Sequence, residues 1–356
     1  MVIWLHQRVK LQELLEINMR KINNVPVEAH TDLSNLTGGE VLKWDGTNTL
    51  MAWEDQDSTG YVPLPAWLGT RGVFAGGWDE SSSSNVIDYI TIATTGNATD
   101  FGNLILARQQ VGGVSGGGRG VFCGGQATGS WTDSNVMDYI TISTLGNASD
   151  FGDLIDAGNA MGQCSSGTRG ILSRQSSKTH NLEYITIASL GDALDFGDYV
   201  VARDNPAGCS NGTRGLFGGG YDGSSRRNEI EYVTIDTIGN ALDFGDLTVG
   251  RNGVAATSST VRALWMGGET NSGGTNTIDY STIDTTGTAI DFGNLLTNKY
   301  SGTACSNDTR AVQGGGRTPT YVNVMEYVTI ATTGNATDFG DLTAVRAYIQ
   351  SGISGD

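Results

Sequence analysis

Histidine, cysteine and proline are all scarce in this chain of 356 residues, and each shortage excludes a class of protein. The three histidines, His6, His30 and His180, share no metal-binding spacing, and no Cys-x-x-Cys pair occurs, so we expect no zinc site. Five prolines beside 52 glycines exclude collagen and proline-rich linkers. Neither a phosphate-binding loop nor a Gly-x-Ser-x-Gly elbow is present. We therefore expect a protein that is not an enzyme and that holds no metal or cofactor.

Positive charge is the next shortage. Lys and Arg number 21 against 38 Asp and Glu, which gives a formal net charge of −17. Because nucleic-acid binding requires a positive surface, this balance argues against a nucleic-acid partner. No run of about 18 apolar residues occurs, and residues 1–21 lack the uncharged core of a signal peptide. We expect no membrane span, and synthesis in the cytoplasm without secretion.

The four cysteines fit a reducing compartment. Cys164, Cys209 and Cys305 each stand five residues before an arginine of a recurring pattern, whereas Cys123 stands elsewhere in that pattern. Cysteines in equivalent places of separate repeat units are poorly placed to pair, so the sequence predicts four free thiols.

What the chain has in abundance is repetition. The ten residues ATTGNATDFG occur at 93–102 and again, unchanged, at 331–340. Three landmarks recur six times with a period of about 48 residues, which indicates a repeat architecture. The Asp-Phe-Gly triplets begin at Asp100, Asp150, Asp195, Asp243, Asp291 and Asp338. The acidic-Tyr pairs are Asp88-Tyr89, Asp138-Tyr139, Glu183-Tyr184, Glu231-Tyr232, Asp279-Tyr280 and Glu326-Tyr327. The repeat arginines are Arg71, Arg119, Arg169, Arg214, Arg262 and Arg310.

Each unit has room for four short strands. In the fourth unit, residues 213–220 are small and apolar like a buried inner strand, and residues 230–237 are rich in β-branched residues. A turn at 238–240 leads to another strand, with a bulge or close packing expected at Gly245. The stretch 205–212 offers a fourth strand. Four strands in such a length match one blade of a β-propeller.

We therefore predict an all-β propeller of six blades, or of seven if residues 33–68 contribute one. After Arg346 the chain continues as AYIQSGISGD, which looks like the opening strand of a further unit. We expect this strand to complete the first blade and so to fasten the ring and hide its edges.

The order of the landmarks resembles that of a kelch repeat. A Gly-Gly pair follows the repeat arginine in five units, and then come the acidic-Tyr strand, an aromatic strand and a closing basic residue. The chain departs from the kelch pattern at the second aromatic, which is Phe. The third unit has Arg174-Gln175 in place of the glycine pair, and the second unit ends with Gly158 in place of the closing basic residue. The resemblance covers residues 61–356, and the GNATDFGDL variant is most similar to kelch-like proteins of tailed bacteriophages. The closing basic residues are Arg108, Arg203, Arg251, Lys299 and Arg346.

Residues 1–60 read as a separate module from the propeller of residues 61–356. Apolar residues over 2–23 have roughly helical spacing, which predicts a helix that packs on its own domain or serves oligomerisation or docking. In KWDGTNT an Asp-Gly turn stands between two short apolar strands, which predicts a hairpin. This part resembles small β-modules of phage tail fibres. The resemblance implies that residues 1–60 attach to other virion proteins and that the chain forms a homo-oligomer.

The repeated landmarks invite structural roles. The triplet aspartates are expected to cap turns. As an alternative, Asp100 and its equivalents could join Asn97 in binding Ca²⁺. Recurrence in every unit favours the structural role, because blade architecture repeats and a binding site usually does not. The repeat arginines are expected to form hydrogen bonds from one blade to the next.

Ligand binding is expected where the repeats differ, in the stretches after the Gly-Gly pairs. These are rich in Ser, Thr and Asn with isolated aromatics, which suits stacking on sugar rings and adaptable hydrogen bonding. The alternative is an ordinary solvated turn whose aromatic side chain covers its own blade. The candidate ligand-binding residues are Trp78, Trp131, Tyr221, Arg226, Arg227 and Tyr321.

These patterns together predict a structural component of a bacteriophage virion, a tail fibre or another appendage, assembled in the host cytoplasm. Its propeller would recognise a glycan or protein of the host surface. Two alternatives remain open at this point: an architectural decoration or collar protein, and a depolymerase that cleaves glycans with paired carboxylates.

Overall fold

The computed structural model describes residues 41–44, 51–54, 68–127, 132–159, 161–173 and 181–355. The chain divides into two compact units, Met1–Pro63 and Leu64–Asp356, and each is considered by itself. In the first unit, β1 (Val41–Trp44) pairs antiparallel with β2 (Met51–Glu54), as the sequence predicts. The helix predicted at residues 2–23 lies outside the described residues.

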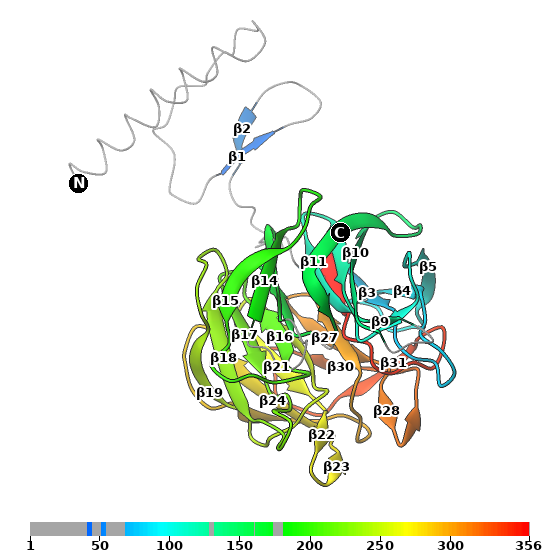
Figure 1. The fold of residues 1–356 in the computed structure, drawn as a ribbon, viewed down its shortest axis with the longest axis vertical. Helices are drawn as coiled ribbons and strands as arrows, with labels where there is room; N and C mark the ends of the chain where they lie inside the picture. The colour runs from blue at the N-terminus through cyan, green and yellow to red at the C-terminus, as the bar shows by residue number, and fades with distance from the viewer. Residues whose placement is uncertain are drawn as a thin grey trace, which may run out of the picture. The chain divides into compact units, whose positions relative to one another are not determined.

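The second unit is a six-bladed β-propeller, which confirms the predicted fold (Figure 1). Each blade is a four-stranded antiparallel sheet, and β1 and β2 pair only with each other in a separate sheet, so the count is six blades rather than seven. The strands, from the innermost outward, are β32 (Ile353–Gly355), β3 (Arg71–Ala75), β4 (Val86–Thr91) and β5 (Thr99–Asn103) in blade 1; β7 (Gly112–Gly116), β8 (Arg119–Cys123), β10 (Ser134–Thr141) and β11 (Ser149–Gly158) in blade 2; β12 (Gln163–Ser165), β13 (Arg169–Ser173), β14 (Asn181–Thr186) and β15 (Leu194–Asp198) in blade 3; β16 (Ala207–Ser210), β17 (Arg214–Gly218), β18 (Glu229–Thr234) and β19 (Leu242–Asp246) in blade 4; β20 (Ala255–Ser258), β21 (Arg262–Met266), β24 (Thr277–Thr282) and β25 (Ile290–Asn294) in blade 5; and β26 (Thr303–Ser306), β27 (Arg310–Gly314), β30 (Val324–Thr329) and β31 (Thr337–Asp341) in blade 6.

The ring is closed by the last described strand, as predicted. β32 pairs with β3 through Arg71↔Gly355 and Val73↔Ile353, so one blade contains segments about 280 residues apart. The buried Ile353 side chain reaches blade 2, where an added Cβ on Gly120 would lie 2.3 Å from its Cδ1 atom. The closing strand is therefore part of the core as well as of the sheet.

The Asp-Phe-Gly triplet forms a bulge in the outermost strand of every blade. In blade 4, Ile230 pairs with Gly245 and Glu231 pairs with Asp243, which leaves Phe244 as the extra residue. Phe244 is buried and meets Tyr232 edge-on, with ring centroids 6.2 Å apart. The bulge predicted at Gly245 is confirmed, and its effect is to turn the aromatic ring inward while the aspartate stays exposed.

The glycine of the triplet lets neighbouring blades approach closely. Gly245 has φ +144°, and a Cβ added there would lie 2.4 Å from the carbonyl oxygen of Gly287 in blade 5. A hydrogen bond crosses the blade boundary at the equivalent corners: the amide of Asp198 donates to Oδ1 of Asn240 at 3.1 Å. The corner between the third and fourth strands thus holds adjacent blades together, which explains why ATTGNATDFG recurs.

The six triplet aspartates themselves are exposed. Within the described residues, no backbone amide donates to their carboxylates, and the acceptor at the corner is an asparagine or aspartate earlier in the turn, such as Asn147. The same part of the chain contains no group of three or more His, Cys, Asp or Glu that could hold a metal ion. The hydrogen bonds at these corners therefore do not show the turn-capping role that the sequence predicts for the triplet aspartates.

Each repeat arginine joins its own blade to the next. Arg214 lies over the ring of Tyr232 in its own blade, 4.4 Å from the centroid, and donates to the carbonyl of Ile283 in blade 5 at 2.9 Å. The other five arginines repeat this arrangement. The bond from Arg310 to the carbonyl of Ile92 carries it from blade 6 to blade 1.

Buried ion pairs form a second set of connections between blades. The closing basic residue of one repeat enters the next blade and pairs with the acidic residue that precedes its tyrosine. Arg251 and Asp279 are 2.7 Å apart with both side chains fully buried, and Arg251 also donates to the carbonyls of Gly267 and Thr277. In blade 3, where Gly158 replaces the basic residue, Glu183 accepts the amide of Ile155. The pairs are Arg346–Asp88, Arg108–Asp138, Arg203–Glu231, Arg251–Asp279 and Lys299–Glu326.

Candidate functional site

The loops that vary between repeats lie on one face of the propeller, which we call the variable-loop face. It consists of the loops 76–85, 124–127, 132–133, 219–228, 267–276 and 315–323. The same face holds the linkers that lead from the outermost strand of one blade to the next blade. The backbones of loops and linkers pair directly. Trp78 in a loop bridges to Ala347 in a linker, and Tyr221 in a loop bridges to Asp204 in a linker. In Figure 1 two of the loops project as small hairpins, β22 (Glu269–Thr270) with β23 (Gly273–Gly274), and β28 (Arg317–Thr318) with β29 (Thr320–Tyr321).

The predicted ligand-binding residues are distributed around this face. Tyr221, Arg226 and Arg227 belong to blade 4, Trp78 to blade 1 and Tyr321 to blade 6. Trp131 lies outside the described residues. The structure therefore separates the blade 4 residues from Trp78 and Tyr321, which come from adjacent blades.

The two arginines of blade 4 are engaged by their own and neighbouring loops. Arg226 pairs with Glu269 of blade 5 at 2.7 Å and donates to Asn252. Arg227 pairs with Asp222 and Glu229. Both arginines therefore hold the loops of blades 4 and 5 in place.

Tyr321 belongs to a group of aromatic residues at the junction of blades 6 and 1. The group consists of Tyr300, Arg317, Tyr321 and Tyr348, and we call it the tyrosine cluster. The rings of Tyr321 and Tyr348 have centroids 6.3 Å apart, and the Arg317 guanidinium lies 5.6 Å from the centroid of Tyr321. Tyr300 exchanges backbone hydrogen bonds with Arg317. All four side chains are partly exposed, so the three tyrosine rings and the guanidinium form an accessible surface.

Of these four residues, only Tyr321 was predicted from the sequence; Tyr300, Arg317 and Tyr348 were not. A signal for the tyrosines was present in the linkers. Tyr300 is the first residue after the closing basic residue of its repeat, and Tyr348 is the second residue after the closing basic residue of its own repeat. Other linkers have polar residues or glycine at these two positions, as in Asn252-Gly253. Aligning the linkers as well as the loops would have singled out the junction of blades 6 and 1.

Arg317 differs electrostatically from the other loop arginines. Within the described residues no carboxylate lies within ion-pair distance of it, and its Nε donates to the carbonyl of Pro319 at 3.0 Å. A hydrogen bond with the Tyr348 side chain, and then the interaction with Tyr300, raise the pKa of Arg317. Burial raises the pKa of Tyr321, to which the nearby charges of Tyr348 and Glu80 also contribute. The cluster therefore places the positive charge of Arg317 among three tyrosine rings.

The backbone of this face is strained at particular positions. All five non-glycine residues with positive φ in the described chain lie on it: Glu80, Gln110, Asn205, Ser301 and Tyr348. Four of them occupy the same linker position, where the fifth linker has Gly253 at φ +59°. A tyrosine is costly there, because its Cβ crowds the backbone in the left-handed region.

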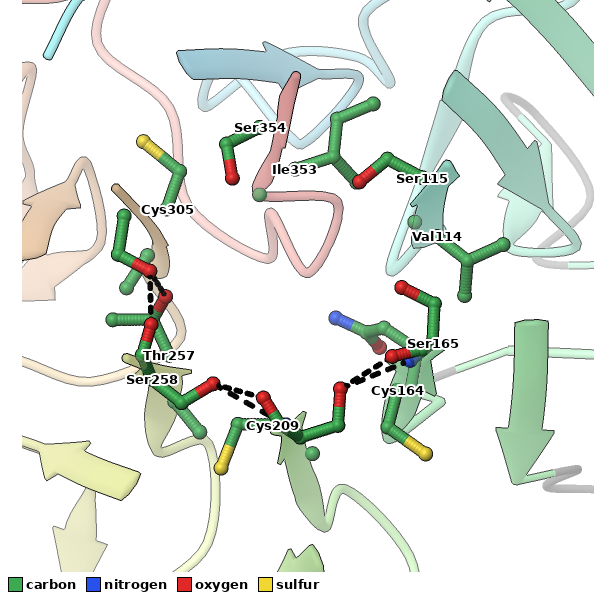
Figure 2. Close-up of a pocket in the computed structure, with 18 of the residues that line it drawn as sticks. Val114, Ser115, Cys164, Ser165, Cys209, Thr257, Ser258, Cys305, Ile353 and Ser354 are labelled. Atoms are coloured by element: carbon green, nitrogen blue, oxygen red, sulfur yellow. Dashed lines mark hydrogen bonds between the residues drawn. The ribbon is translucent and has the colours of Figure 1, made fainter. Parts of the chain in front are cut away.

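A cavity on the propeller axis is the other hollow feature, and Figure 2 shows it. It encloses about 440 Å³ of empty space, counting its open mouth, and all six innermost strands line it. Serine hydroxyls connect these strands: Ser210 donates to the carbonyl of Ser165 at 2.6 Å, and Ser258 donates to the carbonyl of Ser210 at 2.7 Å. No charged side chain is among the described residues that line this axial cavity, so its wall is uncharged.

The thiols around this cavity face away from the propeller axis. In Figure 2 the sulfur atoms of Cys164, Cys209 and Cys305 point outward, and Cys164 fills the space beside Gly215 of the next blade. All four cysteines of the chain are free and buried, and burial raises the pKa of each thiol. They act as small apolar packing residues rather than as nucleophiles.

No protein-family model matches the chain, and no curated protein matches it. Among the described residues no helix has the length and apolar character that crossing a membrane requires.

Two turns of the variable-loop face are built alike and predict a pH response. Asp222 accepts the amides of Ser225 and Ser224, and these bonds lower its pKa. At Asp79, burial acts to raise the pKa, but hydrogen bonds from Ser81 and Ser82 outweigh it. A lowered pKa in the folded state means that these bonds stabilise the turns above the ordinary value of 3.8 and are lost as the pH falls through the lower folded-state value.

We expect the serine amides of both turns to titrate with an apparent pKa below 3.8, which NMR chemical shifts measured against pH would detect. The variant Asp222→Asn serves as the control, because the titration at Ser224 and Ser225 should vanish while that at Ser81 and Ser82 remains. Midpoints at or above 3.8 in the folded chain would contradict the assigned hydrogen bonds.

Proposed function

We propose that this protein is a structural component of a bacteriophage virion, a tail fibre or another appendage, whose propeller recognises a glycan on the host surface. The observation that carries the proposal is the contrast between framework and face. The contacts between blades are made by the same residues in nearly every repeat, whereas the loops and linkers of one face differ from blade to blade. A rigid scaffold that varies on one face is typical of recognition proteins.

Two resemblances support the virion assignment. The order of landmarks resembles that of kelch repeats, and the GNATDFGDL variant resembles repeats of tailed-phage proteins. The hairpin of β1 and β2 belongs to the stretch that resembles phage-fibre modules. We propose that residues 1–60 attach the chain to other virion proteins and support a homo-oligomer. Because a shared fold does not by itself determine function, the binding experiment below carries the test.

The carboxylates of the variable-loop face favour binding over glycan cleavage. A glycosidase needs a general acid whose pKa is raised, beside a second carboxylate. Asp79 and Asp222 have lowered pKa values, and Glu229 and Glu269 are held in ion pairs with arginines. Asp79, Asp222 and Glu229 are therefore favoured in the ionised form, and all four groups hold loops in place.

Sedimentation of the purified protein with envelopes of candidate host bacteria tests the proposal, with released sugars assayed in the supernatant. We expect saturable binding and no released sugar. Released oligosaccharide would instead establish a depolymerase. Failure to bind every envelope, together with capture of other virion proteins, would assign the chain an architectural role.

A further inference from the structure

We propose that the tyrosine cluster, together with Glu80, binds a sugar that carries a carboxylate, such as a uronic acid or a sialic acid. The inference rests on the proposed function and makes it specific, because it names one site on the face and the class of glycan. Three features of the junction between blades 6 and 1 support it.

The first feature is backbone strain at two positions that meet there. The loop of blade 1, Trp78-Asp79-Glu80-Ser81-Ser82, has the same turn as Tyr221-Asp222-Gly223-Ser224-Ser225 in blade 4, down to the Asp–Ser hydrogen bonds. Glu80 has φ +80° where its counterpart Gly223 has φ +94°. Tyr348 has φ +55° at the linker position where the other described linkers have Gln110, Asn205, Gly253 and Ser301.

At both positions the chain carries a large side chain on a backbone that glycine or asparagine would adopt more easily. Glu80 and Tyr348 lie in the same region of the face. The backbone of Trp78 pairs with that of Ala347, next to Tyr348, and Glu80 is close enough for its charge to act on Tyr321. Strain that is tolerated twice at one surface points to side chains retained for contact with a ligand.

The second feature is the open guanidinium of Arg317. Its Nε donates to the carbonyl of Pro319 and one contact goes to Tyr348, but within the described chain no carboxylate lies within ion-pair distance of it. A planar guanidinium matches the two oxygens of a carboxylate, and the pairing is strongest where neighbouring groups exclude water. This feature selects an acidic sugar over a neutral one.

The third feature is the set of aromatic surfaces around that charge. Tyr321 and Tyr348 are inclined to each other by 59°, and Tyr300 comes from the adjacent linker. Phenol rings offer an apolar face for the C–H surface of a pyranose and hydroxyls for its polar edge. The carboxylate of Glu80 is exposed and provides an acceptor for sugar hydroxyls.

The test compares matched probes and matched variants. Methyl glycosides of glucuronic, galacturonic and N-acetylneuraminic acid are titrated by NMR, beside methyl glucoside and methyl galactoside, which lack the carboxylate. We expect at least one acidic glycoside to bind at least about 10-fold more tightly than the neutral probes, and Arg317→Gln to abolish that preference.

The strained positions supply variants that separate binding from folding. Tyr348→Asn and Glu80→Gly introduce the residue types that other blades use in the same conformation. We expect each to melt at or above the wild-type temperature and to weaken binding of the acidic glycoside at least about 10-fold. Asn205→Gly is the control, because it changes the same left-handed linker position between blades 3 and 4 and should leave the affinity unchanged.

The proposal is overturned if no acidic glycoside binds at about 10 mM, if neutral probes bind equally well, or if Asn205→Gly weakens binding as much as Tyr348→Asn. Envelope sedimentation of the same variants distinguishes the two levels of inference. Envelope binding that survives Tyr348→Asn and Glu80→Gly would reject this site and keep the proposed function. Acidic-glycoside binding without envelope binding would keep the site and reject host recognition.

Discussion

Replacing Arg251 by Met is expected to lower the free energy of unfolding by about 3–5 kcal/mol. The substitution removes the cation from a fully buried pair and leaves the Asp279 carboxylate in the core with no opposite charge. Burial already lowers the pKa of Arg251, which shows how strongly this site disfavours an isolated charge. Denaturant unfolding of the purified variant measures the loss.

Two further variants test the cause of that loss. The double variant Arg251→Met/Asp279→Leu removes both charges and should recover most of the stability, because a buried pair is often replaceable by apolar residues. Arg226→Met breaks an ion pair of the same 2.7 Å length whose side chains are 22% and 31% exposed, and it should cost less than about 1 kcal/mol. Equal losses for Arg251→Met and Arg226→Met would show that burial does not set the strength of these pairs.

Removing residues 351–356 is expected to have the larger effect and to abolish the cooperative fold. The deletion takes away the innermost strand of blade 1, the buried Ile353 and the hydrogen bond from Ser351 to the carbonyl of Ala75. The exposed edge of β3 then becomes available for pairing with another chain. We expect a loss of at least about 5 kcal/mol, comparable to the whole stability of many domains. Unfolding curves and size-exclusion chromatography would detect the loss and the association.

A peptide and a point variant make this prediction specific. The peptide SGISGD, which supplies residues 351–356, should restore the fold of the truncated protein in a concentration-dependent manner, because stability gained by binding follows mass action. In the full chain Ile353→Ala should cost about 2–5 kcal/mol. Val345→Ala, at a position 38% exposed in the preceding segment, should cost little. A truncated protein that unfolds like the wild type would show that the closing strand is dispensable.

The repeat pattern was sufficient to predict the propeller, its blade number and its method of closure, because these follow from period, strand propensity and one leftover strand. The bulge at Gly245 was also predictable, since a glycine inside a strand pattern often marks a bulge or a close approach of two backbones. The buried ion pairs were harder. Both members of the Arg251–Asp279 pair were recognised as landmarks, but they stand in different repeats, and their meeting depends on how one blade packs on the next.

The tyrosine cluster escaped prediction for a similar physical reason. Tyr300, Tyr321 and Tyr348 come from two linkers and one loop, and they meet only because linkers pair with loops on one face. The strain at Glu80 and Tyr348 is a property of backbone angles, which composition does not reveal. Residues that act through local spacing were visible in the sequence, whereas residues brought together by the ring were not.

The shared linker position has an evolutionary consequence. In five of the linkers one residue projects from the same left-handed backbone, and the chain places Gln110, Asn205, Gly253, Ser301 and Tyr348 there. Four different side chains, and a glycine in the fifth linker, therefore already occupy one unchanging support. Single-codon changes at this position would alter the surface of this face without lengthening a loop or disturbing the contacts that hold the ring. Such positions are the natural places to randomise when the molecule is used as a display scaffold.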